Sequence, residues 1–538
     1  MISDQLRSEV QDWIKNDPDP VTAEQLSKWL SEGNEFELNR CFNGFLQFGT
    51  AGLRGPISPG PSGMNRAVVS RTATAIASFM KENNLTTVVI GRDARHRSAD
   101  FAKDSAEIFA GAGIKTYLFS QEIPTPVLAF SVNKLNANVG IMVTASHNPA
   151  TDNGYKVYLG ASIGSVHYRG SQIISPIDKE ISDLIEKVEL APTRSSNYEI
   201  VKEEIISDYI LATAKLATTP NNLKIVYTAL HGVGMKTLVS VFEKAKFSKP
   251  ILVSEQALPD PNFPTTPFPN PEENGVMDLA IEYAKKYDAD LVIANDPDAD
   301  RCAVAISDES KNWRMLRGDE VGVILGKYLI ESGKLNGKSV ANSLVSSTLL
   351  SKIAKKHGIG FEETLTGFKW ISKVSNLAYG YEEAIGYCVA PEIVNDKDGI
   401  SAALLIAQLA GELKEKSSSL SDYLQSIGEE FGFHETDQIS IRFADIKEID
   451  TLLSKIKDNP PDQLAGLALE TVEDLSKAKK MQTTGICMKY QNNVRVIVRP
   501  SGTEPKLKCY IEVVSNSKSD AQLRCDLIKK ELTTTLQQ

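Results

Sequence analysis

The sequence lacks the features that mark several specialised classes of protein. Its six cysteines stand singly, with no Cys-x-x-Cys pair and no zinc-ligand spacing, so we assign them no role and expect a reducing compartment. No apolar run approaches the roughly 20 residues of a membrane-spanning helix. The first residues, MISDQLRSEVQDWIKNDPDP, carry acids and lysines where a secretory signal has an apolar core. We therefore expect a cytoplasmic protein with no membrane partner.

A surplus of basic residues is also missing. The chain has 59 lysines and arginines against 69 aspartates and glutamates, a net charge of −10, which argues against a nucleic-acid partner. The basic residues cluster around the motifs described below, and a locally positive pocket in an acidic protein suits a small anionic ligand. With 538 residues and an ordinary globular composition, the chain is long enough for roughly three to four domains.

Apolar patterns indicate helices first and then a regular alternation of strands and helices. Residues 1–40 are expected to be helical, with the Asp-Pro-Asp-Pro sequence after Asn16 breaking one helix. A capping box of Thr22 and Gln25 is expected to start the next helix. From Asn65 onward, strands alternate with helices, which is typical of a mostly parallel sheet with helical crossovers.

This alternation occurs three times. The first two rounds each have three predicted strands: 87–90, 114–119 and 139–143 in the first, and 223–228, 251–253 and 291–294 in the second. Six prolines between Pro259 and Pro271 predict a long loop without regular structure inside the second round. The third round spans about 318–431.

The last part of the chain has a different period. Alternating apolar residues near 439–443, 494–498 and 507–513 predict strands with one buried face, and a charged helix closes the chain. We therefore expect an α/β protein with three α/β domains of mixed or parallel sheets and a smaller C-terminal α+β domain, arranged around a central cleft. The expected domains are residues 1–205, 206–317, 318–432 and 433–538.

Ser146 is the first candidate for chemistry. It lies in VGIMVTASHNPATDNGYK, where a buried strand at 139–143 ends and Pro149 prevents a helix from following at once. Open α/β sheets bind ligands at the carboxyl ends of their strands, so a hydroxyl at this place is a candidate nucleophile. A turn serine that only caps the next segment is the alternative.

Other basic side chains near predicted strand ends have more than one interpretation. His147 suggests a serine hydrolase, but adjacent turn residues rarely make the activating hydrogen bond and no Gly-x-Ser-x-Gly motif is present. We expect His147 to contact phosphate or to order the loop. His231 in HGVG either starts a helix or lines the cleft. The three arginines of GRDARHR face either the cleft or solvent: Arg92, Arg95 and Arg97.

The sequence NDPDADR places three aspartates at alternate positions after a buried strand. Their carboxylates can converge on one hard cation, whereas a turn of solvated acids is the alternative: Asp296, Asp298 and Asp300. The motif is not an EF-hand, because Arg301 replaces its glycine, Ser307 replaces its final glutamate and a strand leads into it. Mg²⁺ commonly combines a few carboxylates with phosphate oxygens, so a phosphorylated group would complete such a site.

The sequence VRPSGTEPKLK is a second anion-binding signal. Arg499 leaves a predicted strand and enters a turn of Ser501, Gly502 and Thr503, which brings together a guanidinium, two hydroxyls and backbone amides. This composition suits a phosphate clamp. A plain turn between two strands is the alternative.

These motifs together give the chain a family resemblance. GTAGLRG, TASHNP, the aspartate loop, YEEAIGY and RPSGTEP stand in the order found in the α-D-phosphohexomutases, which include phosphoglucomutases and phosphomannomutases. The chain resembles this family across nearly its whole length. Its TALHGVG, PDPNFPTTPFPNPEE and YEEAIGY sequences look most like the branch that holds eukaryotic phosphopentomutase and glucose-1,6-bisphosphate synthase, together with related bacterial mutases.

The resemblance implies a set of site residues. It implies that Ser146 is carried as a phosphoserine, that Mg²⁺ binds to its phosphate and to the three aspartates, and that a sugar bisphosphate acts as activator. It further implies proton transfer by Lys156 and Lys397, contact with the transferring phosphoryl group by Arg54 and Arg301, sugar contacts by Thr366, Gly367 and Glu382, and a clamp of Arg499, Ser501, Gly502 and Thr503 on the non-reacting phosphate.

The activity implied by the resemblance is intramolecular phosphotransfer. We expect interconversion of an aldose 1-phosphate and a hexose 6-phosphate, with glucose or mannose as the sugar and a bisphosphorylated sugar as intermediate. Ala384 stands where many hexomutases have serine, which leaves a phosphopentomutase as an alternative. A glucose-1,6-bisphosphate synthase and a non-catalytic phosphosugar-binding protein are further alternatives. The expected partner is a small-molecule phosphosugar, and we expect a monomer or a dimer.

Overall fold

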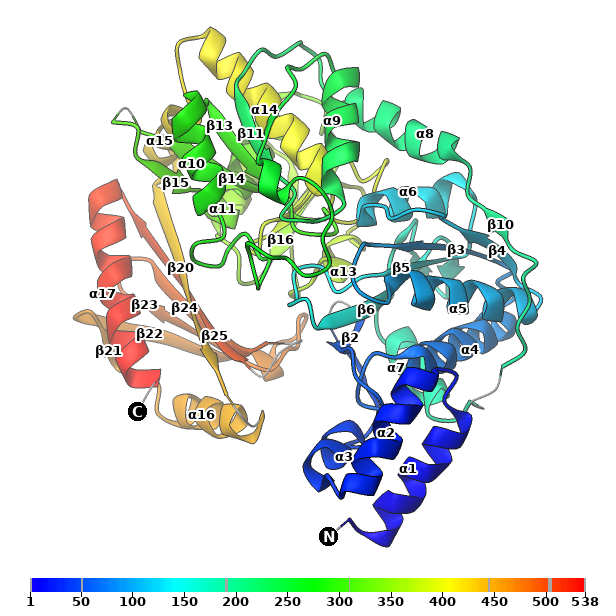
Figure 1. Ribbon diagram of the computed structural model, residues 1–538. Helices are drawn as coiled ribbons and strands as arrows, with labels where there is room; N and C mark the ends of the chain where they lie inside the picture. Colours follow the sequence, from blue (N-terminus) through cyan, green and yellow to red (C-terminus); the bar gives the residue numbers. More distant parts are fainter. Residues whose placement is uncertain are drawn as a thin grey trace. The chain divides into compact units, whose positions relative to one another are not determined.

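The computed structural model describes residues 2–49, 52–188, 192–308, 310–443, 446–501 and 506–536 (Figure 1). The chain forms two compact units that alternate along the sequence. The first unit comprises Met1–Met315 and Gly386–Gln408, and the second comprises Leu316–Ile385 and Leu409–Gln538. Strand β19 (Gly386–Cys388) returns the chain to the first unit, and helix α14 (Gly399–Glu415) crosses the second boundary.

The first unit opens with three helices: α1 (Asp4–Asn16), α2 (Pro20–Glu32) and α3 (Glu35–Cys41). The predicted capping box of Thr22 and Gln25 is wrong. Asp19 caps α2 instead, because its carboxylate accepts a hydrogen bond from the Val21 amide at 3.1 Å. Pro20 fills the first helical position, where a missing N–H costs little. The sequence that ends α1 therefore also begins α2.

The first sheet has eight strands in the order β1-β2-β6-β5-β3-β4-β10, with β9 paired to β6. Strands β5, β3, β4 and β10 are parallel, whereas β6, β2 and β1 extend the sheet in antiparallel fashion. The strands are β1 (Phe48–Gly49), β2 (Gly52–Pro56), β3 (Thr87–Arg92), β4 (Lys115–Leu118), β5 (Val139–Val143), β6 (Asp152–Leu159), β9 (Ser171–Gln172) and β10 (Glu199–Ile200).

Helices cover both faces of this sheet, as crossover connections require. Helix α6 lies on one face, and α4 and α5 pack against each other on the opposite face (Figure 1). These helices and the other short elements of this region are α4 (Arg66–Glu82), α5 (Ser98–Gly111), α6 (Thr125–Lys134), α7 (Ile177–Ile185), α8 (Glu203–Ala214) and the hairpin β7 (Ser162–Ile163) and β8 (Val166–His167).

The second sheet, also in the first unit, has the order β12-β11-β13-β14-β15. Its first three strands are parallel and its last two are antiparallel. After the short helix η1 (Ser254–Gln256), the proline-rich segment contains neither helix nor strand before α10, as predicted. The elements are β11 (Ile225–Thr228), α9 (Gly234–Lys244), β12 (Ile251–Leu252), α10 (Asp278–Tyr287), β13 (Leu291–Ala294), β14 (Ala303–Ser307) and β15 (Trp313–Met315).

The second unit begins with a parallel sheet in which β16 lies between β17 and β18. Helices α11 and α12 pack against each other, and α15 packs against both of them. The elements are α11 (Gly318–Glu331), β16 (Ser339–Ser343), α12 (Leu349–Lys356), β17 (Gly360–Thr364), α13 (Phe368–Ile371), β18 (Leu377–Glu382) and α15 (Leu420–Phe431).

The C-terminal part of the second unit is a six-stranded antiparallel sheet in the order β20-β25-β24-β23-β22-β21. Alternate residues of β24 face opposite sides: Val496 and Val498 join the core under α16 and α17, whereas Ile497 packs with Leu344. The elements are β20 (Phe433–Arg442), α16 (Ile446–Asp458), β21 (Gln463–Leu464), β22 (Leu467–Asp474), η2 (Leu475–Lys477), β23 (Ile486–Tyr490), β24 (Val494–Pro500), β25 (Lys506–Ser515) and α17 (Lys518–Leu536).

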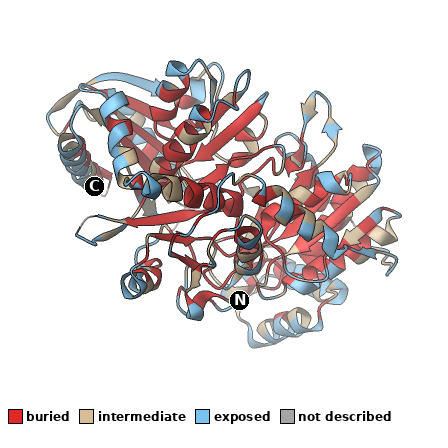
Figure 2. Cartoon of the chain, turned by 90° about the horizontal axis from the view of Figure 1, so that it is seen from above, coloured by how far each residue is buried: buried red, intermediate tan, exposed pale blue. Residues whose placement is uncertain are grey.

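The predicted fold class, three α/β domains followed by a smaller α+β domain, is confirmed. Strands β5 and β13 are buried at every residue, and most sheet strands carry the colour of buried residues in Figure 2. Loops that leave these two strands therefore start from rigid positions. Within the described part of the chain, no helix combines the length and the apolar character that crossing a membrane demands.

Candidate active site

Ser146 lies in the loop that leaves the buried strand β5, as the sequence predicts. Its side chain is almost fully buried, and its Oγ donates a hydrogen bond to Asp296 Oδ2 at 2.6 Å. The residue adopts a left-handed backbone conformation with φ +52°, which is unfavourable for a residue other than glycine. The Ser146 amide donates to Thr144 Oγ1 at 2.9 Å, which helps to hold that turn. The hydroxyl is therefore fixed beside a carboxylate of the second sheet.

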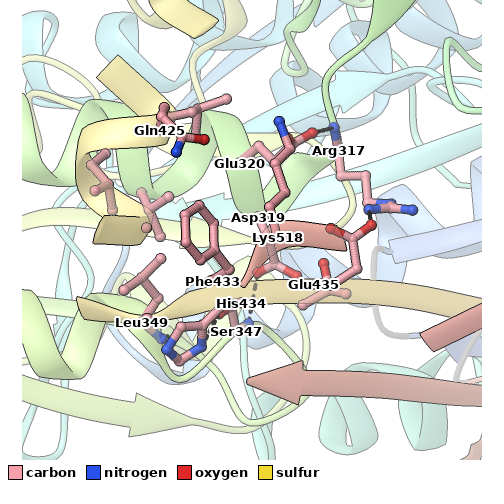
Figure 3. A pocket seen from close by; sticks show the side chains of 16 residues that line it. Arg317, Asp319, Glu320, Ser347, Leu349, Gln425, Phe433, His434, Glu435 and Lys518 are labelled. Atoms are coloured by element: carbon pink, nitrogen blue, oxygen red, sulfur yellow. Dashed lines mark hydrogen bonds and ion pairs between the residues drawn. The ribbon is translucent and has the colours of Figure 1, made fainter. Parts of the chain in front are cut away.

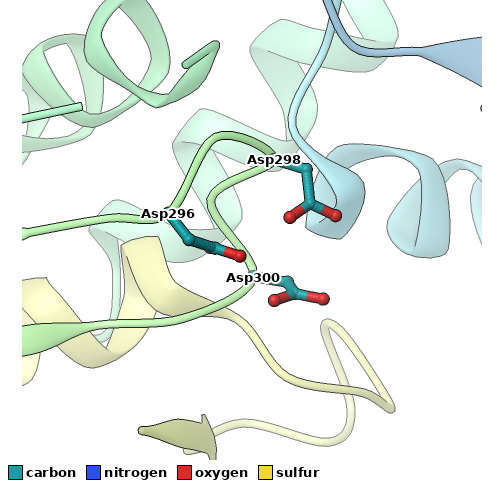
Figure 4. Close-up of side chains that lie close together, drawn as sticks. All are labelled: Asp296, Asp298 and Asp300. Atoms are coloured by element: carbon teal, nitrogen blue, oxygen red, sulfur yellow. The ribbon is translucent and has the colours of Figure 1, made fainter. Parts of the chain in front are cut away.

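Three aspartates follow strand β13 and point toward one another from the loop between β13 and β14 (Figure 4). All three are buried, and one carboxylate oxygen from each lies within 4.8 Å of the others: Asp296, Asp298 and Asp300. The loop is held by close backbone contact, because the Val233 amide donates to Pro297 O at 2.8 Å. A Cβ at Gly232 would lie only 2.3 Å from Pro297 Cα, so this position requires glycine.

Two lysines balance part of this negative charge. Lys156 Nζ lies 2.7 Å from both Asp298 Oδ2 and Asp300 Oδ2, and this lysine is almost fully buried. It comes from β6, whose register places it opposite Met142 of β5. Lys397 Nζ lies 3.6 Å from Asp300 Oδ2. The structure thus brings both predicted proton-transfer lysines to the aspartates.

The electrostatics of the three aspartates depend on how burial and neighbouring charge compete. Burial raises the pKa of Asp296 well above its usual value, and repulsion from Asp298 and Asp300 adds to the effect. Burial also raises the pKa of Asp298 and Asp300, but attraction to Lys156, together with the Thr125 hydrogen bond at Asp298 and the charges of Lys397 and Arg301 at Asp300, lowers both pKa values below the usual value. The two lysines therefore offset only part of the charge of the three aspartates, and a divalent cation would offset more of it.

The donor set fits a hard divalent cation. Asp298 Oδ1 and Asp300 Oδ1 are buried and accept no hydrogen bond from any residue in the described ranges. Buried carboxylate oxygens without partners are costly unless a cation or water binds them. Oxygen ligands from clustered carboxylates are those that Mg²⁺ and Ca²⁺ take in proteins. The triad is thus a candidate metal site.

Two arginines bring positive charge to the same region. Burial lowers the pKa of Arg54, on β2, and the nearby charges of Asp298 and Asp300 raise it. The Arg301 amide donates to Asp296 Oδ1 at 3.0 Å, and Arg301 Nη1 lies 3.8 Å from Glu272 Oε2. Both arginines therefore lie within electrostatic range of the three aspartates.

His147 contacts the serine beside it, which adjacent turn residues rarely do: its Nδ1 lies 3.3 Å from Ser146 Oγ. Burial lowers its pKa well below the usual value, and the charges of Arg301 and Arg54 lower it further, so the ring is neutral at pH 7. Among the described residues no carboxylate hydrogen-bonds to this ring, which leaves a Ser-His-acid relay incomplete. His231 is held elsewhere, with Nε2 2.8 Å from Thr265 Oγ1.

Sequence reasoning missed one residue that the structure places at this site and left the place of a second open. The missed residue is Thr125, at the start of α6, which donates from Oγ1 to Asp298 Oδ2 at 2.6 Å and from its amide to Asp298 O at 2.9 Å. Arg95, for which the sequence left the cleft or solvent open, is buried against the loop that carries Ser146. The only available signal was position, because each follows a parallel strand of the first sheet at its carboxyl end.

The other predicted residues lie in the second unit. Thr366 and Gly367 (φ +104°) form the turn between β17 and α13, and Glu382 ends β18 and is buried. Arg499 lies near the end of β24, and the Ser501 amide donates to Lys506 O at 2.8 Å. Two predicted clamp residues lie outside the described residues: Gly502 and Thr503.

A separate pocket of the second unit is lined by residues of α11, α15 and β20 (Figure 3). Its charged side chains bind one another, as Arg317 does with Glu435. Asp319 accepts hydrogen bonds at Oδ1 from the Ser347 amide at 2.7 Å and from the Tyr381 hydroxyl at 3.0 Å. Burial raises the pKa of Asp319 to about 7. We assign these residues to the packing of the second unit.

Asp319 gives a prediction for the pH dependence of stability. The folded protein holds a proton on Asp319 up to about pH 7, whereas the unfolded chain loses it near pH 4, so this group makes stability fall between those values. Asp319→Asn keeps the Oδ1 acceptor and should remove that fall in stability. Above pH 7 the free energy of unfolding should therefore be higher than in wild type, by at most about 4 kcal/mol. Thermal unfolding measured from pH 4 to 8 checks this. Glu429→Gln, an exposed change on α15, serves as control, and equal pH slopes in Asp319→Asn and wild type would contradict it.

Comparison with known proteins agrees with this arrangement. Four domains of the phosphoglucomutase/phosphomannomutase family match the chain: alpha/beta/alpha domain I at residues 46–191, domain II at 207–309, domain III at 317–431 and the C-terminal domain at 459–530. A Haemophilus influenzae protein named "probable phosphomannomutase" is 46% identical over 85% of this chain and 95% of its own. Homo sapiens phosphopentomutase is 36% identical over 94% of this chain and 91% of its own.

Solved structures share the fold. A phosphoglucomutase/phosphomannomutase family protein from Burkholderia thailandensis superimposes with a TM-score of 0.70 at 18% identity, and the match covers 90% of this chain and 97% of that one. At this identity the likeness concerns the fold alone.

Proposed function

Because the chain belongs to the phosphoglucomutase/phosphomannomutase family and is therefore a phosphosugar mutase, we propose that it moves a phosphoryl group between two hydroxyls of an aldose through Ser146. The observation that supports this most directly is the 2.6 Å contact between Ser146 Oγ and Asp296 Oδ2 inside the buried aspartate cluster. A phosphate on this serine would lie beside carboxylates that need a divalent cation, and such a cation would neutralise both.

The proposed reaction has two balanced steps. In the first, the bond between phosphorus and Ser146 Oγ breaks, a bond to the sugar hydroxyl oxygen forms, and the hydroxyl proton passes to a lysine. In the second, the resulting bisphosphate returns its other phosphoryl group to Ser146, and that sugar oxygen takes a proton back. Lys156 and Lys397 are our candidates for the proton acceptor, because both lie at the aspartates. The acceptor must enter the step as the neutral amine, which a divalent cation at the aspartates would favour by repelling the charge of the ammonium form.

The remaining residues of the first unit position and neutralise charge. Phosphoryl transfer passes through a loose transition state with charge on the equatorial oxygens, so catalysis relies on positioned cations. Mg²⁺ held by the three aspartates would supply such charge. We propose that Arg54 and Arg301 supply the rest and that His147 contacts the serine phosphate.

In the second unit we propose binding roles. Thr366, Gly367 and Glu382 would contact sugar hydroxyls, and a sugar bisphosphate would serve as activator. Arg499 and Ser501, together with Gly502 and Thr503 of the same turn, would hold the phosphate that is not reacting, because a guanidinium and hydroxyls suit phosphate oxygens. We also propose that the four domains end at residues 205, 317, 432 and 538 and that the protein is cytoplasmic.

For the substrate we propose glucose or mannose phosphates first, with ribose or deoxyribose phosphates as the rival. The Haemophilus relative named as a phosphomannomutase has the higher identity of the two reported above, which favours hexoses. The match to the human phosphopentomutase covers more of this chain, and Ala384 removes a hydroxyl contact that many hexomutases have, which favours pentoses.

A direct comparison of substrates tests this order. With Mg²⁺ and catalytic bisphosphate present, we expect kcat/KM for glucose 1-phosphate to exceed that for ribose 1-phosphate by on the order of 10-fold, the size of one lost hydrogen-bonding contact. Ala384→Ser should widen the difference, whereas the control change Glu392→Gln, at an exposed position, should not. A large pentose preference in wild type would reverse the order, and 1,3-bisphosphoglycerate as the preferred donor would indicate a bisphosphate synthase.

A further inference from the structure

Arg95 is a buried arginine that the proposed reaction leaves without a role. It lies in the loop after β3, next to the loop that leaves the parallel strand β5. Its side chain is 1% exposed. A guanidinium taken so far from water must be offset by hydrogen bonds and charge, so the partners of Arg95 indicate what it does.

Within the described residues, the hydrogen bonds of the Arg95 guanidinium go to backbone carbonyls of the serine loop. Nη2 donates to Ser146 O and Asn148 O, both at 2.6 Å. Nη1 donates to Pro149 O at 2.7 Å and to Asp152 O at 3.1 Å. One planar fork thus satisfies four acceptors between the nucleophile and the start of β6. A lysine could not reproduce this geometry, because its donors radiate from a single nitrogen.

The guanidinium is itself fixed from two sides. Arg95 Nε lies 3.4 Å from Asp93 Oδ2, and Asp93 Oδ1 accepts from the Arg95 amide at 3.0 Å and from Ser98 Oγ at 2.7 Å. On the other side, Arg95 Cζ lies 4.9 Å from the ring centroid of Phe263, in the proline-rich segment between η1 and α10. The side chain therefore connects the serine loop with the part of the chain that carries the metal loop.

The serine loop needs such support for two physical reasons. Ser146 has a left-handed backbone, and a hydrogen bond to its carbonyl opposes relaxation to an extended conformation. A phosphate on Ser146 would bring a charge of about −2 close to three buried carboxylates, and repulsion would push the loop away whenever the cation leaves. The positively charged guanidinium of Arg95 is bound to the backbone of the same loop and opposes that movement.

We infer that Arg95 is the positioning residue of the nucleophile, holding Ser146 Oγ at the aspartates in both the free and the phosphorylated serine. The inference rests on the proposed function, because it concerns how that function's nucleophile is placed. Arg95 acts through the backbone of the loop and has no contact with the sugar. Its loss should therefore lower the rate of phosphoryl transfer and leave the binding of sugar phosphate unchanged.

Two variants test this role. Arg95→Lys keeps the charge and loses the fork, and Arg95→Ala leaves a space that free guanidinium can enter. We expect kcat to fall about 100-fold in both, the effect of a displacement near 1 Å, with KM for glucose 1-phosphate unchanged. Millimolar guanidinium chloride should restore part of kcat in Arg95→Ala and none in Arg95→Lys. Hydrogen exchange should rise in residues 144–153 and not in β13.

Arg92→Lys is the matched control, because Arg92 lies in the same segment and binds Asp93 O and Glu122 rather than the serine loop. It should leave kcat, KM and exchange as in wild type. Wild-type kcat in Arg95→Lys, or exchange that rises uniformly over the first unit, would overturn the inference. If the wild-type protein isomerises no sugar phosphate, the proposed function fails instead, and the exchange of residues 144–153 still decides whether Arg95 holds the loop.

Discussion

Ser146→Ala is expected to abolish interconversion of glucose 1-phosphate and glucose 6-phosphate. Alanine removes the oxygen that would carry the phosphoryl group, and neither the histidine beside it nor the lysines at the aspartates can replace a phosphorylated oxygen at that position. Loss of the nucleophile from a covalent mechanism costs roughly 10⁴-fold or more. A coupled assay with catalytic bisphosphate present measures the effect directly.

The fold should tolerate this change. The backbone hydrogen bond from residue 146 to Thr144 Oγ1 involves the amide and survives in alanine. Ser165→Ala, at an exposed position between β7 and β8, is a control that should retain wild-type kcat. Substantial turnover in Ser146→Ala with an unchanged unfolding temperature would show that the reaction does not pass through this serine.

The second large effect concerns the metal site. Asp298→Asn removes one of the two carboxylates that bind Lys156, together with the unpaired oxygen at Oδ1 that is available to a cation. With one fewer charge for the cation, we expect the Mg²⁺ concentration for half-maximal activity to rise at least about 10-fold and kcat to fall roughly 100-fold or more. Removing divalent cations from wild type with EDTA should abolish activity, and added Mg²⁺ should restore it.

Asp308→Asn provides a matched control for this prediction. Asp308 is an exposed aspartate just after β14, where it accepts hydrogen bonds from Asn312. Its replacement should change neither the Mg²⁺ dependence nor kcat. Full activity of wild type in EDTA, or an unchanged Mg²⁺ titration in Asp298→Asn, would contradict a cation held by the aspartates.

The fold could be predicted wherever the local pattern was strong. Strands β5 and β13 are continuous apolar runs, and β24 alternates between apolar and other residues, so each was recognised from the sequence. Strand β6 was missed because DNGYKVYL mixes polar and apolar residues. Its Lys156 is buried only because it binds two aspartates from a distant part of the chain, which no local pattern reveals.

The candidate site was also predictable only in part. Ser146 and the aspartates form short motifs at strand ends, and each motif could be recognised alone, whereas the contact between them depends on how two sheets of the first unit pack. Thr125 belongs to no motif, and GRDARHR left open where Arg95 points, because their hydrogen bonds to Asp298 and to the serine loop exist only in the folded chain. Local hydrophobic patterns do not predict the positions of such residues, which is typical of functional sites.

The most direct test of the account is to locate a phosphate on the protein. Purified wild-type protein incubated with glucose 1,6-bisphosphate and Mg²⁺ is digested, and its phosphopeptides are sequenced by mass spectrometry. We expect one phosphate, on Ser146, and, when that phosphate carries an isotopic label, the label should pass into sugar phosphate on addition of excess glucose 1-phosphate, because each turnover returns the other phosphoryl group of the bisphosphate to the serine. A phosphate found only on another residue, or a fully active enzyme without phosphate on Ser146, would contradict it.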